Sequence, residues 1–392
     1  MLSLYHQVGH NSNWNIDSFE QDNCGDGLIL SPVHQPCLRV ESLSSQTKGR
    51  AFFDPQFYLP NSTKQKLQTY EFFPEVVSGG FRTTDFMAHA FESARLCIDF
   101  QISNGFDRII IPARYFEDME PTYIEKQEAY TLTPFLEILG SMEIDVPVYF
   151  TLPLTSNMIK SEEYRTDLLN WLTGYPEIDG LYVFSYEKRA TKQVQDDEYL
   201  YQYLAFLHEL KEAEFELIVG YSNTESILYS LLGDVSLTMG SFENTRMFSI
   251  DKFLVSDDER RGPRARIYLP GLLNWIQFGQ AKTIMQDMPD LWRRIYSPTN
   301  YADETLAAPV DPTFNQPKLY KHYFQNFSSQ IESLKPLTIE QRYNEIRDSI
   351  RTAMGNYEAI QSNAFDFERH GSMEHLQPWL DAINRYYRNF IR

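Results

Sequence analysis

The stretches GLYVFSY (180–186), ELIVGYS (216–222) and DVSLTMG (234–240) are three short apolar runs that follow one another along the chain. They are rich in β-branched and aromatic residues and have no regular polar face, which is typical of parallel strands buried on both sides. Helix-like stretches at 196–213 and 224–233 separate them. The alternation of buried strand and helix predicts an α/β fold with a parallel sheet.

The same alternation extends back to the N-terminus. Five further apolar runs lie at 2–7, 27–32, 51–59, 108–113 and 146–152. The remaining helix-like segments lie at 15–21, 35–45, 83–105, 123–140, 161–174 and 249–255. Eight consecutive strand–helix units favour a closed barrel, because an open sheet of that size would normally break their order. We therefore predict a (β/α)8 TIM barrel over residues 1–255, and the alternative is a doubly wound open sheet.

From about residue 262 the pattern becomes helical. After one β-like run at 264–270, apolar and aromatic residues recur at three- and four-residue spacing in four segments, 272–286, 318–334, 338–361 and 375–390. A proline-bearing loop at 297–317 follows the first of them. The pattern predicts an all-helical C-terminal extension over residues 256–392. Its aromatic stripes are expected to form its core, and its surface is a candidate interface for a protein partner.

Composition places the chain among ordinary globular proteins. It has 392 residues, 42% apolar and 23% charged, which excludes disordered and fibrous classes. No apolar run approaches the roughly 20 residues of a membrane helix, so we expect no membrane association. The first residues resemble no secretion signal, and Cys24, Cys37 and Cys97 are too scattered for a disulfide framework. We therefore expect a soluble, cytoplasmic protein.

The acidic charge of the chain is concentrated in its first two thirds. Residues 1–260 contain 19 basic and 40 acidic residues, a net charge of −21, whereas residues 261–392 contain 16 and 14, a net charge of +2. Bulk charge of this sign repels nucleic acid and anionic membranes. Any recognition of a polyanion would therefore need a local basic patch.

Active sites of such barrels lie where the strands end, so acidic residues at those ends are the first catalytic candidates. Asp54 lies between Phe53 and Pro55 in an aromatic run, where an unpaired carboxylate would be costly to bury. Glu187 and Glu243 follow the sixth and eighth runs. Together the three acids, Asp54, Glu187 and Glu243, could supply paired carboxylates for acid–base or glycosyl chemistry. Each could equally be a solvated or capping charge.

The polar residues expected to contact a substrate at the same end of the barrel are His6, Gln56, Arg114, Tyr186, Asn223 and Arg246. His6 and His10 would lie about 13 Å apart on an extended strand, which is too far for one metal ion. No clustered cysteines and no glycine-rich nucleotide loop are present. We therefore predict neither a metal nor a cofactor.

Four arginines, Arg260, Arg261, Arg264 and Arg266, lie within seven residues directly after the eighth unit. Barrels often bind phosphate with the loops after strands 7 and 8, and a guanidinium group matches phosphate oxygens. The cluster predicts a phosphate site. The alternative is a loop in which the arginines neutralise Asp257, Asp258 and Glu259.

Parts of the chain resemble the tRNA-guanine transglycosylase family. AFFDPQFYL (51–59) is similar to that family's third strand, in which an Asp precedes Ser-Gly-Gly-Phe, and here the Asp is Asp54. IDGLYVFSY (178–186) occupies the position of a strand that ends in a base-binding Gly-Gly turn. Residues 216–246 resemble a strand, short helix and strand followed by Pro-Thr-Arg, with Asn244-Thr245-Arg246 in its place. The resemblance implies a barrel that binds a nucleobase.

The chain also departs from that family. Thr238 and Met239 stand where the nucleophilic Asp of the eighth strand is expected, and the nearest acid is Glu243. Pro55-Gln56-Phe57 replaces Ser-Gly-Gly, and the cysteine-rich zinc site is missing. The implied architecture therefore does not by itself carry the reaction with it.

Three functional hypotheses follow. The leading one is an enzyme that acts on a nucleobase, a nucleoside or a base in nucleic acid by base exchange or N-glycosidic chemistry, with the arginines on phosphate. The second is a glycoside hydrolase that uses paired carboxylates. The third is a catalytically silent barrel that serves as a subunit of a larger complex.

Overall fold

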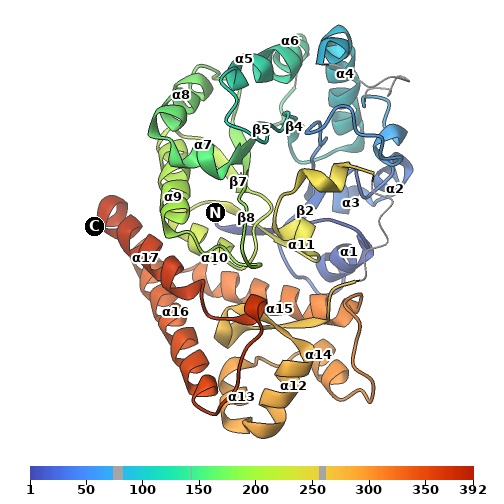
Figure 1. Ribbon diagram of the computed structural model, residues 1–392. Helices are drawn as coiled ribbons and strands as arrows, with labels where there is room; N and C mark the ends of the chain where they lie inside the picture. The colour runs from blue at the N-terminus through green and yellow to red at the C-terminus, as the bar shows by residue number, and fades with distance from the viewer. Residues whose placement is uncertain (74–82, 143, 256–261) are drawn as a thin grey trace.

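The computed structural model describes residues 1–73, 83–142, 144–255 and 262–392. Its main sheet has eight parallel strands, one at each predicted position. They are β1 Ser3–Gln7, β2 Gly27–Leu30, β3 Ala51–Phe53, β4 Ile109–Ile111, β5 Val148–Thr155, β6 Gly180–Tyr186, β7 Glu216–Val219 and β8 Ser236–Gly240. Because β1 pairs with both β2 and β8, the sheet forms a nearly closed barrel (Figure 1), which confirms the predicted fold class.

The barrel is open only between β3 and β4, which stand at the two ends of the hydrogen-bonded order. Both strands have three residues, and Pro55 and Pro112 follow closely. A proline has no amide hydrogen with which to extend a ladder. Gln56 has a left-handed φ of 59°, which turns the chain away from the sheet. The strand predicted over 51–59 therefore ends at Phe53, and Asp54 lies at its C-terminal end.

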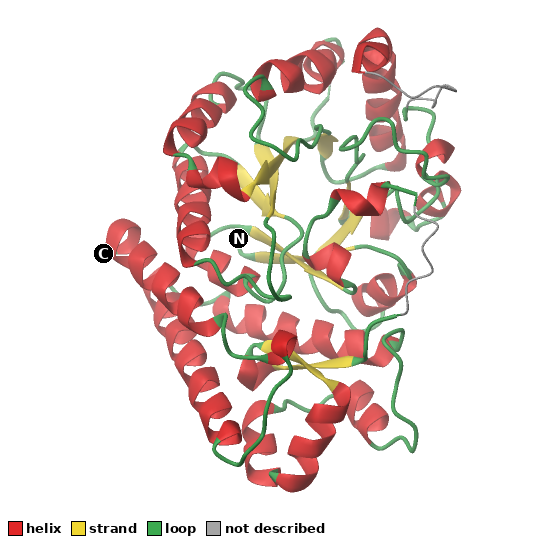
Figure 2. Ribbon diagram, in the orientation of Figure 1, coloured by secondary structure: helices red, strands yellow, loops and turns green. Residues whose placement is uncertain are grey.

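Helices surround the strands (Figure 2). They are α1 Asn13–Glu20, α2 Cys37–Glu41, α3 Ser45–Lys48, α4 Thr83–Asn104, α5 Tyr123–Gln127, α6 Thr133–Gly140, α7 Ser156–Lys160, α8 Glu162–Leu172, α9 Asp197–Glu212, α10 Ser226–Tyr229 and α11 Glu243–Arg246. A π-helical turn at Glu128–Leu132 divides the helix predicted over 123–140. The short helices α7 and α11 were not predicted, and they begin close to the ends of β5 and β8.

The eighth unit differs from its prediction. The segment 249–255 contains only the 3-10 turn η4, Ile250–Phe253. Phe253 and the preceding Phe248 pack on Tyr58 at the barrel mouth, so this segment does not cover the outer wall. Helix α15, Pro317–Leu334, covers β1 instead and also packs on α1. Figure 1 shows α15 running beneath the barrel.

The C-terminal region is not purely helical. A two-stranded antiparallel hairpin pairs β9 Arg266–Leu269 with β10 Asn274–Gln277, so the helix predicted over 272–286 begins only at Phe278. The turn between the strands contains Pro270 and Gly271, a dipeptide that marks turns. The loop predicted at 297–317 contains a helix that Thr299 caps. The remaining helices are α12 Phe278–Asp287, α13 Pro289–Ile295, α14 Asn300–Leu306, α16 Ile339–Gln361 and α17 Leu376–Tyr386.

No helix in the described ranges is both long enough and apolar enough to cross a bilayer.

Candidate functional site

Two groups of polar side chains lie where the barrel strands end. The first surrounds Asp54, which directly follows β3. The Asp54 carboxylate accepts hydrogen bonds from the Tyr58 hydroxyl at 2.7 Å and from the backbone N–H of Gln56 at 3.1 Å. The Tyr221 hydroxyl lies 3.4 Å from its second oxygen. Asp54 is 0% exposed, so its charge is held by these donors rather than by water.

Lys252 lies above this group. Its ammonium nitrogen is 3.7 Å from the centre of the Tyr221 ring, and Phe248 and Phe253 complete an aromatic surround. Burial raises the pKa of Asp54 to about 6, against the opposing effects of Tyr58 and Lys252. Burial also lowers the pKa of Lys252 to about 7. This group therefore contains a buried carboxyl group with a raised pKa and a buried amine with a lowered pKa, both beside aromatic side chains.

The second group lines a cleft of about 620 Å³ between the barrel mouth and the C-terminal region. Its walls come from the ends of β1 and β8, the loop after β6, the β9–β10 hairpin and the start of α15. The lining residues are His10, Lys192, Phe242, Glu243, Asn244, Arg246, Pro263, Arg264, Arg266, Trp275, Phe314, Asn315 and Tyr320. We call it the mouth cleft.

One wall of the mouth cleft is a continuous row of aromatic rings. Trp275 and Tyr320 lie 6.0 Å apart, Tyr320 and Phe242 lie 5.2 Å apart, and Phe242 and Phe314 lie 6.4 Å apart, measured between ring centres. The rings come from β10, α15, the end of β8 and the loop before α15. Such a wall suits a planar ring as ligand.

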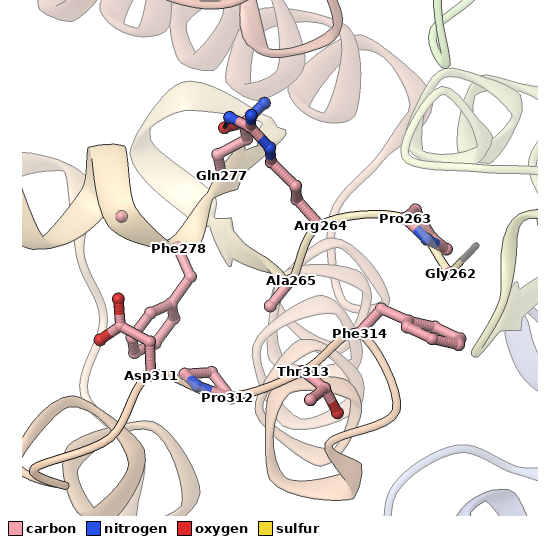
Figure 3. A pocket seen from close by; sticks show the side chains of 11 residues that line it. Gly262, Pro263, Arg264, Ala265, Gln277, Phe278, Asp311, Pro312, Thr313 and Phe314 are labelled. Carbon is pink, nitrogen blue, oxygen red and sulfur yellow. Dashed lines mark hydrogen bonds between the residues drawn. The ribbon is translucent and has the colours of Figure 1, made fainter.

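A smaller pocket of about 190 Å³ adjoins the mouth cleft. Lys192, Glu243 and Arg246 line both cavities, and Arg189, Asn223 and His370 are among the other residues of the smaller one. A further pocket of about 490 Å³, drawn in Figure 3, shares Pro263, Arg264 and Phe314 with the mouth cleft. In Figure 3 the Arg264 side chain extends to Gln277, whose Oε1 accepts its hydrogen bond at 3.2 Å.

Arg246 is the least expected side chain of the cleft. Only 6% of the residue is exposed, and its guanidinium carbon lies 4.2 Å from the centre of the Trp275 ring. Its Nη1 donates to Asn223 Oδ1 at 3.3 Å, and its Nε finds no hydrogen-bond partner within the described ranges. None of the carboxylates that the structure describes lies within ion-pair distance of this guanidinium. A buried cation without a counter-ion is costly unless a ligand supplies the negative charge.

The other cations of the cleft have acidic or amide partners. Lys192 pairs with Glu243, and Arg266 pairs with Glu368. Burial and the nearby guanidinium groups of Arg266 and Arg246 lower the pKa of Lys192 to about 7. The negative charge of Glu368 opposes this lowering of the Lys192 pKa.

Glu187 belongs to a buried triad beside the smaller pocket. Arg189 bridges it to Glu225, with contacts of 3.4 Å to Glu187 and 3.0 Å to Glu225. Burial raises the pKa of Glu187 to about 7, and the negative charge of Glu225 acts in the same direction while Arg189 opposes it. This triad positions Arg189 at the pocket wall.

The predicted substrate residues are distributed over the molecule. Asn223 and Arg246 come together in the smaller pocket, and Asn223 also donates to the Lys192 carbonyl at 3.1 Å. Gln56 belongs to the Asp54 group.

The other three predicted residues lie apart from the mouth cleft. His6 faces outward from β1, where its Nε2 bonds to the Cys24 carbonyl and its ring packs on Phe324. Arg114 lies between Phe116 and Tyr130 at the end of β4, and Tyr186 packs on Tyr115 at the end of β6.

The arginine cluster is only partly described. Arg264 and Arg266 line the mouth cleft, as a phosphate site would require, whereas Arg260 and Arg261 lie outside the described residues. Of the three predicted acids, Glu243 lines the two cavities, whereas Asp54 and Glu187 are covered.

Sequence reasoning missed Lys192, Arg189, Trp275 and Lys252. The segment EKRATK (187–192) follows β6 and contains three cations, which was an available signal at a strand end. Trp275 gave no signal, because its β-strand was predicted as helix. In the described part of the chain, no three His, Cys, Asp or Glu side chains group closely enough to hold a metal ion.

No protein-family model matches the chain, and no match was found among curated proteins or solved structures.

Proposed function

We propose that the chain is a barrel enzyme that acts on a phosphorylated nucleoside or a similar phosphorylated planar ring bound in the mouth cleft. The observation that carries the proposal is Arg246, a buried guanidinium that faces the cleft and has no carboxylate partner in the described ranges. A phosphate would supply the missing negative charge through charge-assisted hydrogen bonds.

The remaining parts of the mouth cleft support the same ligand class. Arg264 offers a second guanidinium, which donates to Gln277 Oε1, and Asn223 holds Arg246 in place. The row of rings from Trp275 to Phe314 offers a stacking surface for a base. An acidic chain would gain selectivity for a small anion by confining its basic groups to one cavity.

Glu243 and Lys192 are the groups placed for proton transfer beside such a ligand. They form an ion pair that lines both cavities, so one donates and the other accepts at the same point. The chemistry that we propose therefore relies on a carboxylate and an amine rather than on two carboxylates. N-glycosidic cleavage, in which the leaving base takes a proton, is a reaction that this pair could assist.

The test compares guanosine with guanosine 5′-monophosphate by calorimetric titration at low and high salt. We expect the monophosphate to bind about 10- to 100-fold more tightly, since charged hydrogen bonds contribute about 1.5–3 kcal/mol. The preference should shrink as salt rises. The variant Arg246→Met keeps an apolar cover on Trp275 and removes the charge, so it should abolish the preference.

The control is Arg351→Ala, which removes an exposed arginine of α16 and should leave the preference unchanged. Equal binding of the two ligands by the unmodified protein would contradict the proposal. Failure of both ligands and of inorganic phosphate to bind would contradict it as well.

A further inference from the structure

Lys192 lies at the boundary between the mouth cleft and the smaller pocket. It is in the loop after β6, and Asn223 holds its carbonyl oxygen at 3.1 Å. Its side chain is 17% exposed and pairs with Glu243, which begins α11. The Lys192 amine therefore comes from the loop after β6, and the Glu243 carboxyl group and the Arg246 guanidinium come from α11 after β8. All three line both cavities.

The surroundings of Lys192 favour the uncharged amine. Burial and the positive charges of Arg266 and Arg246 lower the pKa of Lys192 to about 7. A lowered pKa makes the neutral, nucleophilic amine more available than it is in an ordinary lysine. The positive neighbours that lower the pKa are also the groups that would attract an anionic ligand.

We propose that Lys192 forms an imine with a phosphorylated aldehyde or ketone bound in the mouth cleft, and that Glu243 transfers the protons. This inference rests on the proposed anion site at Arg246 and assigns to the same cleft a phosphorylated carbonyl compound, which is a substrate class other than the intact nucleoside. The phosphate would lie on Arg246 and Arg264, and the carbonyl carbon would lie at the Lys192 nitrogen.

The step balances without an oxidant or a reductant. Within the ion pair Lys192 first gives one proton to Glu243. The nitrogen lone pair then forms a bond to the carbonyl carbon, and the C=O π electrons move to oxygen, which takes that proton from Glu243. The nitrogen loses one proton to Glu243, which returns it to the hydroxyl group. The C–O bond then breaks, water leaves, and the nitrogen gives its second proton to Glu243, which leaves a neutral C=N bond.

Lys252 is the internal control. The pKa of Lys252 is also about 7 because of burial, so its amine has similar intrinsic reactivity. It lies over the Tyr221 ring near Asp54, and it is not among the residues that line the mouth cleft or the smaller pocket. Lys252 therefore tests whether a low pKa suffices without access to the cleft, and the comparison of a phosphorylated with an unphosphorylated probe at Lys192 tests anion assistance.

The experiment uses pyridoxal 5′-phosphate and pyridoxal as probes on the full chain, followed by borohydride reduction and peptide mass spectrometry. We expect the phosphorylated aldehyde to label Lys192 at least 10-fold more than Lys252 or the exposed Lys188. Pyridoxal should label Lys192 about 10-fold less than its phosphate does. Labelling should rise with pH to half its maximum near pH 7.

Three variants separate the contributions. Lys192→Arg should remove the adduct, and Glu243→Gln should slow its formation. Arg246→Met should remove the advantage of the phosphorylated probe while labelling by pyridoxal persists. Circular dichroism of each variant checks that it folds.

The outcomes distinguish this inference from the proposed function. If Lys192 stays unlabelled, or reacts no more than Lys188, while Arg246 still confers phosphate preference, the imine is excluded and the anion site stands. If both probes label Lys192 equally and Arg246→Met changes nothing, the anion site fails, and the assignment of a phosphorylated substrate fails with it.

Discussion

Asp54 shows how a buried acid is held without a direct ion pair in the described ranges. Tyr58, the Gln56 amide and Tyr221 surround its carboxylate, and Lys252 acts on it from above. The folded protein raises the pKa of Asp54 from 3.8 to about 6, so it binds the proton more tightly than the unfolded chain does. The stabilisation from this proton is complete below pH 3.8 and is lost as the pH rises through 6.

Replacing Asp54 with Asn therefore has a pH-dependent effect. The Asn side chain still offers an oxygen acceptor to the Tyr58 hydroxyl and to the Gln56 backbone N–H, but it does not ionise. The free energy of unfolding of Asp54→Asn should therefore not fall between pH 4 and 6 because of this residue. Across that pH range the free energy of unfolding of Asp54→Asn should rise relative to that of the unmodified protein by up to about 3 kcal/mol. Urea denaturation at several pH values measures it.

Asp54→Ala is the comparison. It leaves the Tyr58 hydroxyl and the Gln56 amide without an acceptor, so it should be about 1–3 kcal/mol less stable than Asp54→Asn at every pH. Equal stability of the two variants, or an Asn variant that does not fold, would show that the charge and not the hydrogen bonds holds this group together.

At the level of elements, the strands fit together because large rings face glycines. A Cβ built on Gly180, the first residue of β6, would lie 2.4 Å from the Tyr149 ring, and one built on Gly27 would lie 2.5 Å from the Tyr5 ring. Tyr5 stacks on Phe52 with centres 4.5 Å apart, so one layer of the barrel interior is almost entirely aromatic. The glycines make room for that layer.

Gly180→Ala should therefore destabilise the protein by about 1–3 kcal/mol, because the Tyr149 ring and the Glu216 carbonyl would have to move. Gly355 provides the matched control, since it lies inside α16 and nothing lies within 4 Å of an added Cβ. Gly355→Ala should stabilise the protein by about 0.5–1 kcal/mol. Chemical denaturation should show a lower free energy of unfolding for Gly180→Ala and a higher one for Gly355→Ala. Changes of the same sign in both variants would contradict this account.

For the whole molecule, the C-terminal region completes the barrel wall. Helix α15 covers β1 through contacts such as Phe324 on His6, and Gly25 of the α1–β2 loop donates to Ser328 of α15. Helix α17 packs on α9, and the Trp379 indole donates to the Val194 carbonyl at 3.0 Å. Removal of α15 would expose an apolar side of the barrel to water.

The chain is therefore expected to unfold as one cooperative unit. Phe324→Ala should lower the free energy of unfolding by about 3–5 kcal/mol and should shift the transitions of both regions together. Far-ultraviolet circular dichroism and tryptophan fluorescence, followed during denaturation, should give coincident curves. Phe91→Ala is the control, because Phe91 is 48% exposed on α4 and should change stability little. The expectation is contradicted if the barrel and the C-terminal region unfold in two separate transitions and Phe324→Ala shifts only one of them.

The number, order and approximate position of the barrel strands can be read from the amino-acid sequence. A strand buried on both faces has to be a continuous apolar run, and a helix that covers it has to repeat every three or four residues, so both patterns can be read locally. GLYVFSY at 180–186 coincides with β6, and the helix predicted over 338–361 corresponds to α16 with a difference of one residue at its start.

Tertiary packing sets which helix completes the wall and which side chains share a cavity. Segment 249–255 was predicted as a helix, but it forms only a 3-10 turn because Phe253 packs on Tyr58 at the barrel mouth. Helix α15 covers β1 instead. Lys192, Arg246 and Trp275 are far apart in the chain and meet because the barrel brings strand ends together and the hairpin packs across them. Such meetings depend on loop paths and on burial, which local periodicity does not encode.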